Sequence, residues 1–194
     1  EGGMVVTSNE TLARIVKKMT MYGISDSREI WNSRYTEKGH WFYDIEMIGY
    51  KANMTDLNAA LGLHQLARLD GFNATRQKYA AIYKENLKDA GCDFMHVLPN
   101  NTCCWHLFPL LLTEHIDRGE FIIQLKERGV GASVLFRPLH LHTAYQKLFG
   151  TKEGDYPVSE KVFNRLINLP ISPSINEGDI HCVADTVKEL CKRC

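Results

Sequence analysis

The pattern of apolar and polar residues first becomes readable near the start of the chain. Residues 4–7 form a short apolar run, and the polar pair Ser8-Asn9 follows it. This pattern predicts a buried strand over residues 4–7, with Ser8-Asn9 capping a helix. The helix is expected from Glu10 to Tyr22, with Gly23 ending it. One of its faces carries apolar residues three or four positions apart, namely Leu12, Ile15, Val16 and Met19.

The next segment, residues 24–53, has no clean period but carries six aromatic residues. So many aromatic side chains argue against disorder, so we expect an ordered loop packed over another part of the protein. A helix rich in Ala and Leu is predicted from Thr55, with Thr55 or Asn53 near its cap. We expect a break or bend around Asp70-Gly71 and a second helix over 73–90 that ends at Gly91.

The pattern changes after Gly91, where short apolar runs begin to alternate with helical segments. This alternation predicts an α/β protein in which residues 91–194 form a small α+β domain and residues 1–90 a separate region. The expected strands cover 102–112 and 130–136, and the expected helices cover 116–128, part of 138–150, 158–169 and 177–192.

Composition and charge exclude several classes of protein. The 194 residues include 23 basic and 23 acidic side chains, so the formal net charge is zero, and no block of like charge stands out. This balance argues against a nucleic-acid partner or a membrane-surface role. Apolar runs fall well short of the roughly 20 residues that a membrane helix needs. The six cysteines follow no disulfide framework, so a cytoplasmic location is expected. The terminal Cys-Lys-Arg-Cys is either a metal or redox motif or a frayed helix end.

Two histidines stand out as candidates for binding. His140 and His142 directly follow a predicted strand, and alternation in an extended segment would place both on one side. They could bind a polar substrate, an anion or a metal, or they could be loop histidines paired with backbone carbonyls. A zinc site needs further ligands, and no cysteine lies at a suitable spacing, so no metal site is expected.

Lys51 and Asn53 form the second candidate, because they come just before a predicted helix start. Backbone N–H groups and a cationic side chain at such a position favour an anion such as phosphate. The alternative is that Asn53 or Thr55 only caps the helix while Lys51 lies in solvent. These residues alone indicate an α/β protein with a possible anion site.

Four stretches together resemble a known family. They are EGGMVVTSNETLARIVKKMTMYGI, RYTEKGHWFYDIEMIGYKANMTDLNAALGLHQLARLD, LKERGVGASVLFRPLHLHTAYQKLF and GDYPVSEKVFNRLINLPISP. In their order and spacing they resemble the DegT/DnrJ/StrS sugar aminotransferases, which are pyridoxal-phosphate enzymes with the aspartate aminotransferase (fold type I) fold. The resemblance implies that residues 1–90 are the end of the large domain and residues 91–194 the small domain. It also places the Schiff-base lysine upstream of Glu1, so no catalytic residue is expected in this chain.

The resemblance implies a reaction, a cofactor and partners. Pyridoxal 5'-phosphate would accept an amino group from an amino acid, typically glutamate, and pass it to a nucleotide-linked keto-sugar. The enzyme would be a homodimer with the active site at its interface. Asn53 and Lys51 match the segment that reaches the partner's cofactor phosphate. Ala52 replaces the aromatic residue common there. The implied substrate-binding residues are His140, His142, Tyr145, Trp41 and Tyr43.

Two other functions stay open on the sequence. A pyridoxamine-dependent sugar dehydratase has the same fold, with histidine in place of the Schiff-base lysine. A non-catalytic protein that keeps the dimer surface and acts as a partner or regulator is the third hypothesis, and it would bury its apolar faces by association.

Overall fold

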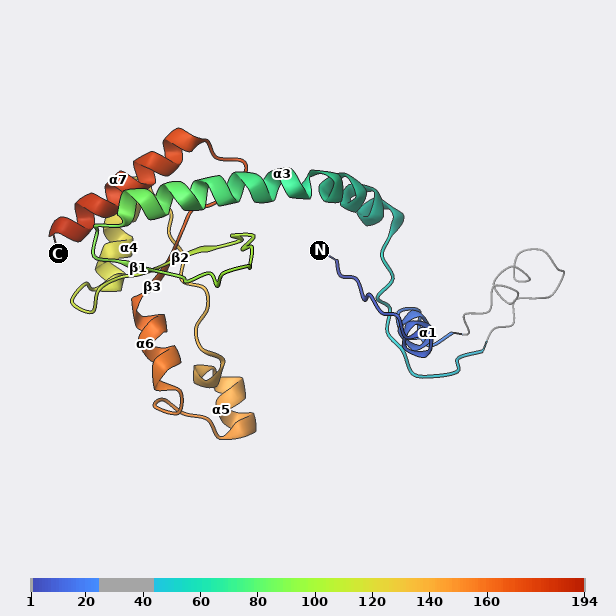
Figure 1. Ribbon diagram of the computed structural model, residues 1–194. Helices are drawn as coiled ribbons and strands as arrows, with labels where there is room; N and C mark the ends of the chain where they lie inside the picture. Colours follow the sequence, from blue (N-terminus) through green and yellow to red (C-terminus); the bar gives the residue numbers. More distant parts are fainter. Residues whose placement is uncertain (1, 25–43, 194) are drawn as a thin grey trace. The chain divides into compact units, whose positions relative to one another are not determined.

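A computed structural model describes residues 2–24 and 44–193 of the chain (Figure 1). The chain divides into two compact units, Glu1–Arg68 and Leu69–Cys194, which are described separately below. The boundary lies within helix α3, which extends over Asp56–Leu87. The expected domain division after residue 90 stays a prediction. The compact units divide earlier because the later turns of α3 contribute Tyr79, Ala80 and Tyr83 to the core of the second unit.

In the first unit, helix α1 covers Glu10–Met19, and the Asn9 side chain accepts a hydrogen bond from the Leu12 N–H at 3.0 Å. The predicted cap and helix start are therefore correct, but the helix ends at Met19 and not at the predicted Tyr22. The predicted strand over 4–7 is wrong, because this segment is irregular and Met4 and Val6 are 85% and 86% exposed. A strand needs a neighbour to accept its backbone hydrogen bonds, and no strand among the described residues pairs with this one.

Of the break or bend predicted at Asp70-Gly71, the break is wrong, because α3 is one continuous helix that ends at Leu87 and not near Ala90. A glycine inside a helix costs only about 1 kcal/mol relative to alanine, which is too little to end a long helix by itself. The Thr75 hydroxyl also donates to the Gly71 carbonyl at 3.0 Å within the helix. At its start, the Asn58 N–H donates to the Thr55 hydroxyl, so Thr55 and not Asn53 caps the helix.

The second unit contains an antiparallel sheet in the order β1-β2-β3, formed by Asp93–Phe94, Phe108–Leu111 and Leu166–Leu169. Leu110 of β2 pairs with Ile167 of β3. The predicted strand over 102–112 is thus confirmed only at its end. The strand expected over 130–136 is reduced to a single bridge between Ser133 and Asn168.

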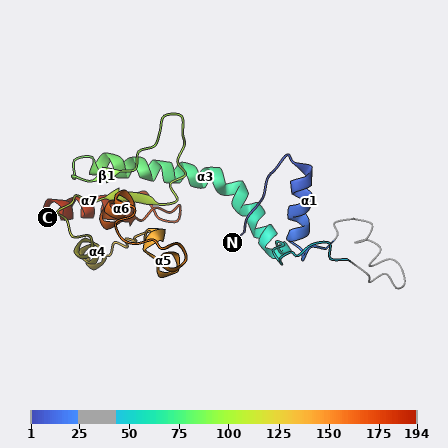
Figure 2. The same cartoon turned by 90° about the horizontal axis from the view of Figure 1, so that it is seen from below.

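Helices and a short 3-10 turn complete the second unit (Figures 1 and 2). Their bounds are Arg118–Glu127 for α4, Leu139–Leu141 for the 3-10 turn η1, Thr143–Phe149 for α5, Pro157–Arg165 for α6 and Glu177–Arg193 for α7. The helix expected over 158–169 ends early, because its last residues belong to β3, where Ile167 and Leu169 are buried. Helix α7 packs against α4.

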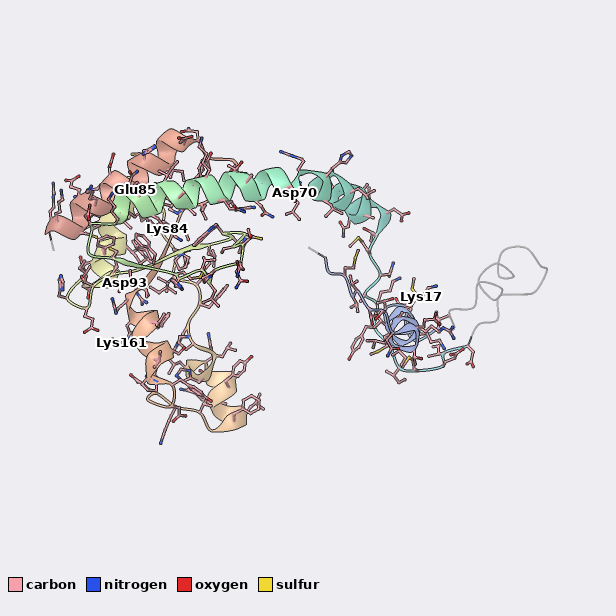
Figure 3. All side chains as sticks on the ribbon, in the orientation of Figure 1. Lys17, Asp70, Lys84, Glu85, Asp93 and Lys161 are labelled. Atoms are coloured by element: carbon pink, nitrogen blue, oxygen red, sulfur yellow. The ribbon has the colours of Figure 1, made fainter. Side chains whose placement is uncertain are left out.

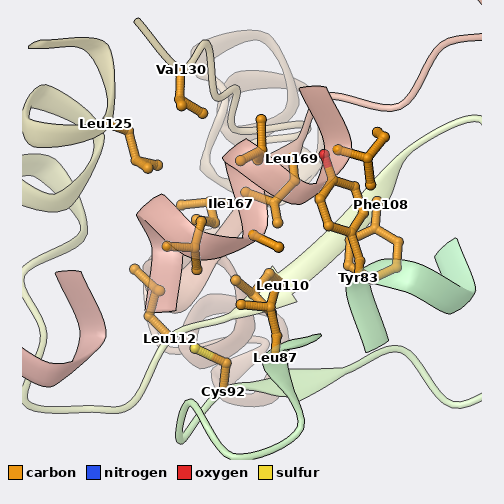
Figure 4. Close-up of a cluster of buried hydrophobic side chains, with 14 of the residues drawn as sticks. Tyr83, Leu87, Cys92, Phe108, Leu110, Leu112, Leu125, Val130, Ile167 and Leu169 are labelled. Carbon is orange, nitrogen blue, oxygen red and sulfur yellow. The ribbon is translucent and has the colours of Figure 1, made fainter. Parts of the chain in front are cut away.

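The core of the second unit lies between α3, the sheet, α4 and α7 (Figure 4). Tyr83 is completely buried and its ring lies 4.8 Å from that of Phe108. Its hydroxyl donates to the Pro170 carbonyl at 2.7 Å, and the Tyr79 hydroxyl donates to the Ile175 carbonyl at the same distance. Both bonds join α3 to the segment between β3 and α7.

We expect Leu110→Ala to destabilise the second unit by about 2–5 kcal/mol, because it removes a fully buried side chain from the central strand and leaves a cavity. The matched control is Ile123→Ala on α4, where the side chain is 50% exposed and the expected loss is below about 1 kcal/mol. Urea unfolding followed by circular dichroism measures both, and equal losses would contradict the assigned core.

Candidate functional sites

The first candidate site is the segment from Lys51 to Asn53 in the first unit. Three backbone hydrogen bonds hold the chain here against the end of α1: Tyr22 N–H to the Tyr50 carbonyl, Tyr50 N–H to the Met19 carbonyl, and Ala52 N–H to the Thr20 carbonyl, at 2.7–2.9 Å. An antiparallel bridge pairs Met21 with Lys51. The backbone that carries Lys51 is therefore fixed by regular pairing even though its side chain is exposed.

Among the described residues, the Lys51 ammonium group contacts a thioether and an aromatic ring. Its Nζ lies 3.2 Å from the Met21 sulfur and 5.3 Å from the centre of the Tyr22 ring. No described carboxylate is paired with it, whereas nearby Lys18 forms an ion pair with Glu46. A thioether and an aromatic face orient a cation without neutralising it. Within the described part of the chain, Lys51 is therefore oriented but has no carboxylate partner, an arrangement that suits attraction of an anion.

Asn53 is exposed and makes no side-chain hydrogen bond to another described residue. Thr55 takes the cap of α3, so the Asn53 amide stays available as a donor. Asp56 occupies the first turn of this helix, and its negative charge opposes an anion at the helix end. The capacity of this segment to bind an anion therefore depends on the side chains of Lys51 and Asn53.

The second candidate site is a pocket of about 680 Å³ in the second unit. Its wall combines aromatic rings with hydroxyl groups from η1, α5, the following loop and α6. The lining residues are Leu139, His140, Tyr145, Phe149, Thr151, Tyr156 and Ser159. Such a surface provides ring faces for stacking and a few hydrogen-bonding groups for orientation, as is usual in sites for small molecules.

His140 is buried and held from two sides. Its Nε2 lies 2.7 Å from a Glu160 carboxylate oxygen, which can only accept, so the imidazole N–H donates. Glu160 also accepts from the Gly154 N–H at 2.9 Å, and the Thr151 hydroxyl donates to the His140 carbonyl. The hydrogen bond from His140 holds the pKa of Glu160 below its usual value. The Tyr156 ring lies 4.8 Å from the imidazole. This arrangement fixes one wall of the pocket.

The predicted site residues are only partly brought together. His140 and Tyr145 line the same pocket, but His142 is exposed at the start of α5 and does not line it. The extended geometry expected for His140 and His142 is wrong, because the chain forms the 3-10 turn η1 there. Trp41 and Tyr43 lie outside the described residues. Glu160 was missed because its contact with His140 spans 20 positions, and no local pattern marks it.

Neither a metal centre nor a membrane span is found within residues 2–24 and 44–193. No three His, Cys, Asp or Glu side chains in these ranges cluster as metal ligands would. No helix in them is long and apolar enough to cross a membrane.

Solved structures resemble this chain closely. Spr1654 from Streptococcus pneumoniae, described as a sugar aminotransferase and solved in its PMP form, superimposes with a TM-score of 0.86 at 25% sequence identity. The superposition covers 96% of this chain and 46% of that protein. The likeness confirms the predicted fold class, α/β with the fold of type I pyridoxal-phosphate sugar aminotransferases.

Sequence relatives extend over nearly the whole chain. MJ1066 from Methanocaldococcus jannaschii is 41% identical over 98% of this chain, and the spore coat polysaccharide biosynthesis protein SpsC from Bacillus subtilis is 39% identical over 99% of it. The chain spans about half the length of each of these relatives, 50% in both cases. A family model matches residues 1–188, which confirms the resemblance seen in the sequence motifs: the chain belongs to the DegT/DnrJ/EryC1/StrS aminotransferase family.

Proposed function

We propose that this chain is the C-terminal portion of a pyridoxal-phosphate-dependent aminotransferase that moves an amino group from an amino acid, glutamate in the first instance, to a nucleotide-linked keto-sugar. The observation that carries the proposal is the Lys51 ammonium, which no carboxylate within residues 2–24 and 44–193 neutralises, on a segment fixed by backbone pairing. Amino transfer is preferred to sugar dehydration because the matching family and the similar structure are both described as aminotransferases.

Lys51 and Asn53 suit the phosphate group of pyridoxal 5'-phosphate. A phosphate brings a double negative charge and several acceptor oxygens. Lys51 offers a cation that no described carboxylate pairs with, and Asn53 offers an amide donor without a described side-chain partner. When bound, the cofactor supplies the electron sink for amino transfer. The role of Lys51 and Asn53 is to anchor it by its phosphate, within a homodimer whose active site lies at the subunit interface. The Schiff-base lysine is not assigned to any residue of this chain.

The pocket around His140 suits the nucleotide-sugar substrate. Tyr145 and Tyr156 offer ring faces, and the Thr151 and Ser159 hydroxyls offer hydrogen bonds to sugar or base atoms. His140 contributes by its position, because its Nε2 is already bonded to Glu160. His142 is proposed as a contact beyond the pocket wall, and Trp41 and Tyr43 as further substrate contacts. A cytoplasmic location agrees with a pathway that consumes sugar nucleotides.

We expect Lys51→Ala to raise the dissociation constant of pyridoxal phosphate by about 10- to 100-fold, because a charged hydrogen bond is worth roughly 1.5–3 kcal/mol. Titration of the apo form of the full-length enzyme, followed by the absorbance of the cofactor, measures this constant. The matched control is Lys17→Ala, which removes an exposed lysine on α1 (Figure 3). An equal effect of both variants would contradict the assignment of the phosphate to Lys51.

Tyr145→Ala should raise the KM for the nucleotide-sugar about tenfold, since an aromatic contact contributes roughly 1 kcal/mol beyond the area it buries. The KM for the amino-acid donor should change much less, because the donor does not need this ring. Steady-state kinetics with each substrate varied in turn separates the two constants. Leu148→Ala, at a 75% exposed position of α5 outside the pocket, is the control. Unchanged KM values in Tyr145→Ala would contradict the assignment of the nucleotide-sugar to this pocket.

A further inference from the structure

Two cysteines that are far apart in the sequence lie side by side in the second unit. The sulfur atoms of Cys92 and Cys191 are 3.4 Å apart, and both residues are free thiols. Cys92 is 8% exposed, and Cys191 is partly buried against the same core. Among the described residues, the other free cysteines have no such sulfur neighbour; they are Cys103, Cys104 and Cys182.

The two residues come from distant parts of the second unit, Cys92 from the turn between α3 and β1 and Cys191 from α7. Cys92 follows Gly91, whose φ of +73° turns the chain from the end of α3 into β1. Figure 4 shows Cys92 at the margin of the core, beside Leu87 and Leu112. Cys191 lies near the end of α7. Cys92 lies in the turn just before β1 but belongs to the buried core, and Cys191 lies on a helix that packs against the same core, so packing holds the two sulfur atoms together.

The two thiols differ in their chemical roles. The two sulfur atoms share a hydrogen bond, and this contact with Cys92 lowers the pKa of the Cys191 thiol. The same bond and the burial of Cys92 raise the pKa of the Cys92 thiol. Cys191 is also the more accessible of the two. A thiolate is the nucleophile in disulfide exchange, so Cys191 is the residue suited to react first and Cys92 the one suited to resolve.

We propose that Cys92 and Cys191 form a reversible redox-modification site, which closes to an intramolecular disulfide in the presence of a low-molecular-weight disulfide. First the Cys191 thiolate attacks one sulfur of the reagent. A mixed disulfide forms at Cys191, the S–S bond of the reagent breaks, and one reagent thiolate leaves. Cys92 then loses its proton to solvent and attacks the Cys191 sulfur, and the second reagent thiolate leaves. The two cysteines give up two electrons, and the reagent is reduced to two thiols.

The bridge would connect the last turn of α7 to the junction of α3 and β1. It would close most of the second unit into one covalent loop, and the chain-entropy model assigns the greater stabilisation to longer loops. This inference depends only on the geometry of the second unit, so it stands or falls independently of the proposed amino transfer.

Oxidised glutathione serves as the probe in the test. The full-length protein is incubated with it, alkylated, digested without reduction and mapped by mass spectrometry. We expect a peptide pair linked through Cys92 and Cys191, together with a rise in the urea midpoint of unfolding that dithiothreitol reverses. Cys191→Ser should lose both the link and the rise, whereas Cys104→Ser, at an exposed position, should keep both. Cys92→Ser and Cys92→Ala should also lose the link and the rise. Both are made because Cys92 is buried, and the alanine variant places no hydroxyl in the core.

Three results would overturn the proposal. One is a lasting glutathione adduct on Cys191 with no link to Cys92. Another is a bridge from Cys191 to Cys194 in place of Cys92. The third is a reversible rise in the urea midpoint that persists in Cys191→Ser.

Discussion

The second unit depends on how the polar ends of buried aromatic side chains are paired. Tyr83 is completely buried between α3 and the sheet, and a buried hydroxyl without a partner costs roughly 1–3 kcal/mol. The Pro170 carbonyl supplies that partner, and proline leaves this position of the chain without an N–H of its own to satisfy. Burial also raises the pKa of Tyr83, so the hydroxyl stays protonated and remains a donor. The bond fixes α3 to the chain that leaves β3, and the remaining core packs around this connection.

The two candidate sites differ in how their main polar side chain is held. The described neighbours of Lys51 are a thioether and an aromatic ring, which orient its ammonium group without forming an ion pair with it. His140 is held by a carboxylate that lowers its freedom to serve a ligand directly. The first arrangement suits recognition of an anion by charge, and the second suits a rigid wall whose shape selects the ligand.

Local signals in the sequence predicted local structure well. The Asn9 cap and the start of the helix that follows it are correct because a cap and its helix depend only on residues a few positions apart. The α5 end at Gly150, with φ of +68°, follows from the same kind of rule. Residues 166–169 were misread as helix because a short apolar run has no decisive period, and only pairing with β2 made it a strand. The strand expected over 4–7 failed because pairing partners are not a property of the segment itself.

Some residues of the candidate sites could be predicted from local sequence, and others could not. Lys51, Asn53 and Tyr145 followed from motifs and resemblance, whereas Glu160 could not, because its contact with His140 depends on how α6 returns to η1. The sequence also offered no reason to assign different roles to His140 and His142. The structure separates them, since η1 buries His140 and leaves His142 exposed.

Thr55 caps α3 and Asn53 does not, so the two residues are under different constraints. Because Thr55 alone caps α3, the helix places no demand on the side chain two positions earlier. Asn53 is therefore constrained only by what it binds, while Thr55 is constrained by the helix. Substitutions at positions 53 and 55 should therefore act differently, the first on the binding of the anion and the second on the stability of the fold.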